Sequence, residues 1–162
     1  MKYFIDTEFI EYPCTIDLIS IGIVCEDGRE LYCISTEFDK SKADKWVEEN
    51  VLSQLPSRDN TAWMSRLNIC REIGMFIGND KPEFYGYYAD YDWVVFCWIF
   101  GRMIDLPKGW ARYCKDLKQM LDTRGLGKDW VKENCPTPVD EHNALSDAWW
   151  NLKLFNQINR VL

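Results

Sequence analysis

The stretch E-H-N-A-L-S-D-A at 141–148 holds the only histidine of this 162-residue chain, His142, five positions before Asp147. A histidine can act as a general base near neutral pH, and a carboxylate can bind a divalent metal ion. Five residues turn about 140° around an α-helix, so the two side chains would meet only if His142 lies in the loop before the helix. Pro136 and Pro138, just upstream, favour such a loop. Each residue also has an ordinary alternative, as a surface histidine and as an acid favoured by the helix dipole.

Two further carboxylates lie in F-I-D-T-E-F, where Asp6 and Glu8 are two residues apart on an expected strand. Side chains two apart on a strand point to the same face, so the two acids would repel each other and be costly to bury. Divalent cations remove that cost, and hard cations prefer oxygen ligands. The alternative is that this face lies at the exposed end of the sheet, because a D-x-E pattern alone is common.

A further acid occurs in Y-Y-A-D-Y-D-W-V-V-F, 87–96, at the junction of an expected strand and an expected helix. Ligands gather at the carboxyl ends of strands in sheets of this kind. Asp92 suits the first turn of the helix, where the helix dipole favours a negative charge. On the residues alone, Asp90 competes for the same role, and either acid could simply begin the helix.

Composition narrows the class of protein. The formal net charge is −7, so the chain lacks the basic balance of a protein that grips long duplex DNA. Clustered carboxylates that hold metal ions would still allow a polyanion substrate, and charge that serves only solubility fits equally well. Seven cysteines without a C-x-x-C pair argue against a disulfide framework or a zinc ribbon and favour reduced thiols in a cytoplasm. The N-terminus does not resemble a signal peptide, and the longest apolar run, Trp93 to Phe100, is too short to span a bilayer, so no membrane partner is expected.

The hydrophobic pattern predicts one α/β domain over residues 1–162. Three strands in succession indicate an antiparallel meander, and strands that then alternate with helices indicate parallel pairing. The expected strands are 2–10, 18–24, 31–36, 83–88 and 111–114. The expected helices are a short one around Trp46 and longer ones over 61–77, about 92–103, 116–124 and 144–160, with a loop region at 125–138. This order predicts a mixed sheet with helices on both faces.

The acids and the histidine form an ordered set that resembles the DEDD exonuclease superfamily, in its DEDDh branch. D-T-E at 6–8 is similar to the first motif of that superfamily, and H-N-A-L-S-D-A at 142–148 is similar to its third, H-x-A-L-x-D-A. The Tyr branch would need a tyrosine where this chain has Asn143. The resemblance implies a ribonuclease H-like fold, which has the same order of strands and helices.

A closer resemblance, to the RNase AS family of small bacterial 3′–5′ exoribonucleases, covers most of the chain. It rests on Y-F-I-D-T-E-F-I-E (3–11), L-I-S-I-G-I-V (18–24), E-D-G-R-E (26–30), S-T-E-F-D (35–39), W-x-S-R (63–66) and Y-D (91–92). That family prefers polyadenylate and has relatives in phages. The resemblance therefore implies single-stranded RNA bound by its 3′ end, a homodimer, and a place in the cytoplasm of a bacterium or a phage host. It selects Asp92 over Asp90, and it is weakest over 105–138, which bears on local substrate contacts and any dimer surface.

The resemblance also implies a role for each residue of the set. Two divalent ions, Mg²⁺ or Mn²⁺, would clamp the attacking and leaving oxygens of the terminal phosphodiester. Asp6 would bridge both ions, and Glu8 and Asp147 would complete the site of the ion that carries the water. Asp92 would support the second ion. His142 would act as the general base, and the products would be 5′-mononucleotides.

Three residues are candidates for substrate binding. Phe9 is placed like the apolar wedge that other DEDD exonucleases use beside the last bases, although packing in the core explains it equally well. Trp63 and Arg66, in W-M-S-R, are candidates for base and phosphate contact, although Trp63 also fits the core stripe of a helix. Two rival functions stay open: a 3′–5′ DNA exonuclease of proofreading type, and a non-catalytic module of the same fold that binds RNA or a protein.

Overall fold

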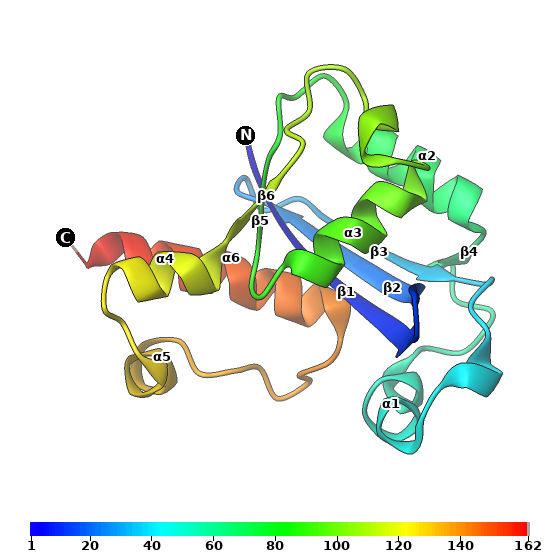
Figure 1. Ribbon diagram of the computed structural model, residues 1–162, viewed down its shortest axis with the longest axis horizontal. Helices are drawn as coiled ribbons and strands as arrows, with labels where there is room; N and C mark the ends of the chain where they lie inside the picture. Colours follow the sequence, from blue (N-terminus) through cyan, green and yellow to red (C-terminus); the bar gives the residue numbers. More distant parts are fainter. Residues whose placement is uncertain (162) are drawn as a thin grey trace.

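A six-stranded mixed sheet forms the centre of the computed structural model, which describes residues 1–161 (Figure 1). Its strands are β1 (Lys2–Tyr12), β2 (Thr15–Cys25), β3 (Glu30–Ser35), β4 (Trp63–Met64), β5 (Glu83–Gly86) and β6 (Cys114–Asp116). They lie in the order β4-β3-β2-β1-β5-β6, with β1 inside the sheet. The pairs β1–β2 and β2–β3 are antiparallel, and the other three pairs are parallel. The predicted mixed α/β sheet, with a meander of three strands followed by parallel strands, is confirmed.

Helices cover both faces of this sheet. They are α1 (Lys45–Asn50), α2 (Arg66–Ile77), α3 (Asp90–Ile99), α4 (Leu117–Thr123), α5 (Lys128–Asn134) and α6 (Ala144–Arg160), with short 3-10 helices η1 (Lys40–Lys42), η2 (Leu52–Gln54) and η3 (Met103–Asp105). Figure 1 shows α2 and α3 on one side of the sheet and α6 on the other. Within residues 1–161, no helix combines the length and the apolar character needed to cross a membrane.

The two faces of β1 belong to different cores. Tyr3 and Ile5 pack in one apolar cluster with residues of α2 and α3, whereas Phe4 packs in a second cluster with residues of α4 and α6. Successive side chains of a strand alternate between the faces of a sheet. Asp6 and Glu8 therefore share the α6 face with Phe4, as their spacing predicted.

The helix predicted over 61–77 begins later in the structure, at Arg66, because Ser65 is its N-cap. The Ser65 side chain accepts a hydrogen bond from the amide of Asn68 at 3.3 Å, and its extended backbone separates α2 from the preceding residues. Those residues form β4 instead, in which Trp63 pairs with Ile34 of β3. The predicted loop at 125–138 also differs, since it contains the short helix α5.

A close contact between β2 and α6 fixes the position of the last helix. A Cβ atom at Gly22 would lie 2.1 Å from the carbonyl oxygen of Ala144, so any larger residue would push the helix away. Ala144 and Ala148 are fully buried in this contact. The first turns of α6 therefore lie directly against the sheet, next to the strand that carries Asp6 and Glu8.

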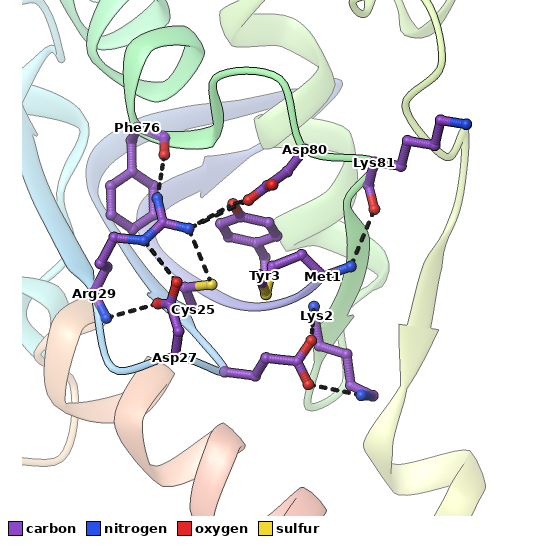
Figure 2. A network of polar contacts seen from close by, with 10 residues as sticks. Met1, Lys2, Tyr3, Cys25, Asp27, Arg29, Phe76, Asp80 and Lys81 are labelled. Atoms are coloured by element: carbon purple, nitrogen blue, oxygen red, sulfur yellow. Dashed lines mark hydrogen bonds and ion pairs between the residues drawn. The ribbon is translucent and has the colours of Figure 1, made fainter.

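The amino end of β1 is held by a network of polar contacts around Arg29 (Figure 2). The Tyr3 hydroxyl donates to Asp80 Oδ2 at 2.5 Å, and Arg29 Nη2 donates to the same oxygen at 3.3 Å. Arg29 also donates to the Phe76 carbonyl at 2.7 Å and to Asp27 Oδ2 at 2.8 Å. The network joins β1, the β2–β3 turn and the end of α2, and so keeps the strand in place from the end opposite its carboxylates.

Candidate active site

A cleft of about 540 Å³ opens where the carboxyl end of β1 meets α1, α3 and the loop before α6. Five predicted catalytic residues share it: Asp6, Glu8, Asp92, His142 and Asp147. They come from one strand, two helices and a loop, and the fold alone brings them together. Their predicted roles stay predictions at this point, because the geometry gives their positions alone.

Glu8, His142 and Asp147 form the tightest group in the cleft. One ligand atom from each residue lies within 4.8 Å of the others, a spacing that one ion can span. Asp6 lies two residues before Glu8 on the same face of β1. The donors are therefore mainly carboxylate oxygens, with the His142 imidazole beside them, and oxygen donors suit Mg²⁺ or Mn²⁺ better than a soft metal.

The charges in this group oppose one another. Burial, followed by the carboxylates of Asp92, Glu8 and Asp147, raises the pKa of Asp6 well above its usual range. Burial and the charges of Asp147 and Asp92 raise the pKa of Glu8 to about 8. Without a cation, the cluster relieves this cost only by holding protons at neutral pH. The residues therefore fit a divalent metal site, whose positive charge would offset the repulsion.

Asp92 is held on β1 by the residue between the two strand acids. Both the Thr7 backbone amide and the Thr7 hydroxyl donate to Asp92 Oδ1, at 2.8 Å and 2.6 Å. Burial raises the pKa of Asp92 to about 6, although the two Thr7 hydrogen bonds lower it. Asp90 is exposed and does not line the cleft, whereas Asp92 is buried in it. The structure thus distinguishes Asp92 from Asp90, which the sequence pattern alone did not.

His142 lies in the loop before α6, as the spacing to Asp147 required. Its backbone amide donates to Asp147 Oδ2 at 2.8 Å, and its backbone has a positive φ of 71°. Asn143 caps the helix, since its side chain accepts from the amides of Leu145 and Ser146. Burial raises the pKa of Asp147 to about 6, and the hydrogen bond from His142 lowers it. One carboxylate therefore both lines the cleft and orders the loop that carries the histidine.

Sequence reasoning missed a residue that joins α6 to β1. Asn151 is 1% exposed, and its side-chain amide donates to the Ile5 carbonyl at 2.9 Å. It lies one helical turn after Asp147 and one strand residue from Asp6, so it sets the distance between the two acids. The available signal was a polar amide on the apolar stripe of the last helix.

Of the three predicted substrate-binding residues, only Phe9 lines the cleft. Its ring is half-buried and meets the exposed ring of Tyr91 edge to face, with centroids 5.9 Å apart. It also packs against the core below α2 and α3. Both interpretations of Phe9 therefore have support, and its contact with RNA stays a prediction.

Trp63 and Arg66 are not among the residues that line the cleft. The Trp63 indole donates to the Pro56 carbonyl at 3.1 Å, and the Arg58 guanidinium lies over its ring at 3.7 Å. Arg66 is paired with the buried carboxylate of Asp17. The observed contacts of both residues are structural, and the geometry gives no support to their predicted role in substrate binding.

Comparison with known proteins identifies the activity. Residues 1–159 match the model of the family described as the 3′–5′ exoribonuclease Rv2179c-like domain. The 3′–5′ exoribonuclease Rv2179c of Mycobacterium tuberculosis strain H37Rv is 42% identical over 161 residues, which cover 98% of this chain and 93% of the relative. The 3′–5′ exoribonuclease MT2234.1 of strain CDC 1551 has the same identity and coverage.

Among solved structures, exonuclease I shares the fold with a TM-score of 0.65 at 13% identity. The match covers 98% of this chain but 42% of that chain, so this protein spans less than half of its length. The likeness confirms the predicted ribonuclease H-like fold. This chain is an enzyme that belongs to the Rv2179c-like family of 3′–5′ exoribonucleases.

Proposed function

We propose that this protein is a metal-dependent exoribonuclease that removes 5′-mononucleotides from the 3′ end of single-stranded RNA, with His142 as its general base. The observation that carries the proposal is the meeting of four carboxylates and the only histidine at the carboxyl end of β1. Nothing else in the described part of the chain gathers a comparable set of metal-binding side chains. The alternative function, a non-catalytic binding module, would not require these four carboxylates and the histidine together.

Each residue of the cleft has a distinct task in this proposal. Asp6 would hold both divalent ions, Glu8 and Asp147 would hold the first, and Asp92 would hold the second. When bound, Mg²⁺ or Mn²⁺ supplies positive charge to the attacking and leaving oxygens of the phosphodiester. The chain itself supplies the proton acceptor, since the His142 imidazole takes a proton from the attacking water. The water oxygen would bond to phosphorus, the P–O3′ bond would break, and the leaving 3′-oxygen would take a proton from solvent, which gives a 5′-mononucleotide and an RNA with a new 3′-hydroxyl.

RNA would be held in the cleft by its bases rather than by cations. Besides Trp46, which lies against the His142 ring, four aromatic residues line the cleft, namely Phe9, Tyr87, Tyr88 and Trp150. Within residues 1–161, none of its lining residues is Lys or Arg. Stacking on aromatic rings contributes about 1–3 kcal/mol per base and does not need a charged groove. On the strength of the sequence resemblance, we also propose that the enzyme prefers polyadenylate, forms a homodimer and acts in the cytoplasm.

The test uses 5′-labelled single-stranded oligoadenylate with purified protein and Mg²⁺ or Mn²⁺. We expect a ladder that shortens stepwise from the 3′ end, stops on addition of chelator, and is nearly lost with His142→Ala. Matched RNA and DNA oligonucleotides in parallel distinguish the exoribonuclease from a proofreading type. A ladder that persists unchanged with His142→Ala would remove the histidine from catalysis.

A further inference from the structure

The loop that carries His142 is attached to the rest of the protein at two backbone positions. The His142 amide donates to Asp147 Oδ2, as described above. On the other side of the cleft, the side chain of Gln54 in η2 donates to the carbonyl oxygen of Glu141 at 2.8 Å. The segment from α1 to η2, which comes nearly ninety residues earlier in the chain, therefore holds the residue next to the catalytic histidine.

Among residues 1–161, the aromatic neighbour of the His142 imidazole is Trp46 of α1. The two ring centroids lie 4.8 Å apart with an interplanar angle of 76°, an edge-to-face contact. Within residues 1–161 we find no hydrogen bond to either ring nitrogen of His142. In other catalytic sites, a general base is oriented by a carboxylate or carbonyl on its second nitrogen. Here the ring contact found for the imidazole is instead the edge-to-face contact with Trp46.

Trp46 is itself held at a defined distance from β1. Asp44 caps α1 by accepting from the amide of Val47 at 2.8 Å, which starts the helix just before Trp46. Val47 and Val51 pack in an apolar cluster with Ile10 of β1. Ile10 lies two residues beyond Glu8 on the same strand. The cluster therefore fixes α1, the helix that carries Trp46, relative to the strand that carries the metal-binding carboxylates.

We propose that Trp46 is a positioning residue for His142, and that its ring holds the imidazole in the orientation needed to accept a proton. The proposal rests on the proposed function, in which His142 is the general base. Its consequence is specific to the chemical step. Loss of the ring should lower kcat and leave KM nearly unchanged, because an interaction that orients the base acts in the transition state more than in substrate binding. The expected fall is roughly 3- to 10-fold, the factor that corresponds to an edge-to-face aromatic pair.

The test compares Trp46→Ala with Trp46→Phe and with Trp98→Ala. Trp98 is a matched control, since it is 50% exposed against 51% for Trp46 and does not line the cleft. Steady-state kinetics on oligoadenylate with Mg²⁺ gives kcat and KM for each variant. Because the chain has one histidine, NMR of its imidazole C–H groups reports His142 directly in the same folded protein.

We expect Trp46→Ala to move the imidazole signals and to lower kcat at constant KM, Trp46→Phe to restore most of kcat, and Trp98→Ala to change neither. Unmoved signals, or moved signals with an unchanged kcat, would overturn the proposal. A raised KM at constant kcat would also overturn it, because Trp46 would then be a stacking surface for RNA. His142→Ala serves as the reference. If that variant keeps full activity, the proposed function fails. If it is inactive while Trp46→Ala is fully active, only the positioning role fails.

Discussion

We predict that the charge of Glu8 lowers the free energy of unfolding of the metal-free protein. Its carboxylate is partly buried beside Asp147 and Asp92, and the pKa of Glu8 is raised to about 8 as a result. Glu8→Gln keeps the shape of the side chain and removes its charge. We therefore expect this variant to be more stable than the native protein at pH 8.5 in the absence of metal, and to be inactive as an exonuclease.

The direction follows from proton binding. An acid whose pKa is higher in the folded state binds more protons there than in the unfolded chain, so the free energy of unfolding falls as pH rises from about 4.5 to about 8. A pKa difference of that size corresponds to at most ~5 kcal/mol. Relaxation and water around a half-buried group reduce the figure to on the order of 2 kcal/mol. For a chain of this length, that corresponds to a gain of about 4–8 °C in Tm.

Thermal unfolding with EDTA at pH 5 and pH 8.5 measures the effect. The native protein should lose stability between the two pH values, whereas Glu8→Gln should lose less, and the two should be nearly equal at pH 5. Glu133→Gln, an exposed position on α5, is the control and should behave as the native protein does. Adding Mn²⁺ at about 100 times its Kd should stabilise the native protein by about 2.7 kcal/mol and the variant by less. If Glu8→Gln is no more stable than the native protein at pH 8.5 with EDTA, the electrostatic description of the cleft is wrong.

Three further predictions concern the parts that position the cleft and its substrate. Asn151→Ala leaves the buried Ile5 carbonyl without its donor and should lower the free energy of unfolding by about 1–3 kcal/mol in urea titrations. Gly22→Ala forces a Cβ atom against the Ala144 carbonyl and should cost about 3 kcal/mol, with reduced metal affinity in calorimetry because α6 moves. Since no lysine or arginine among residues 1–161 lines the cleft, KM for oligoadenylate should rise no more than about 3-fold between 50 and 200 mM monovalent salt. A steep salt dependence would indicate an RNA-binding surface outside the cleft.

The strand acids and the histidine loop were predictable because their positions depend on local chemistry. Asp6 and Glu8 share a face because side chains alternate along a strand, and His142 precedes α6 because Asn143 is a strong N-cap. The choice of Asp92 over Asp90 needed family resemblance. In the structure it depends on hydrogen bonds from Thr7, which lies 85 residues away in the chain.

Other parts of the fold and of the site could not be predicted from local pattern. β4 has two residues and is defined by its pairing with β3, which a helix-like pattern around Trp63 concealed. The contact of Trp46 with His142 joins a short helix to a loop almost a hundred positions away. Such contacts follow from how the layers pack, and short elements contribute too few residues for a periodic signal.

The acidic cleft leads to one more prediction, about RNA binding without metal. Seven of the residues that line the cleft are acidic, and none is a lysine or arginine within residues 1–161. In the absence of a cation, these carboxylates repel the terminal phosphate of RNA. Oligoadenylate should therefore bind His142→Ala, the variant expected to be nearly inactive, more weakly in EDTA than in Mg²⁺.

At pH 8.5, above the pKa of about 8 that Glu8 has without metal, adding Glu8→Gln to that variant removes most of one negative charge near the phosphate. The change should tighten binding in EDTA by about 1 kcal/mol, or roughly 5-fold, because the interaction of two charges across a partly solvated cleft is of that order. Fluorescence anisotropy of labelled oligoadenylate gives both affinities, and Glu133→Gln in the same background provides the control. Equal affinity with EDTA and with Mg²⁺ would mean that RNA binds elsewhere on the protein. If affinity falls in EDTA but Glu8→Gln does not restore it, the bound phosphate lies away from Glu8, beside the other carboxylates of the cleft.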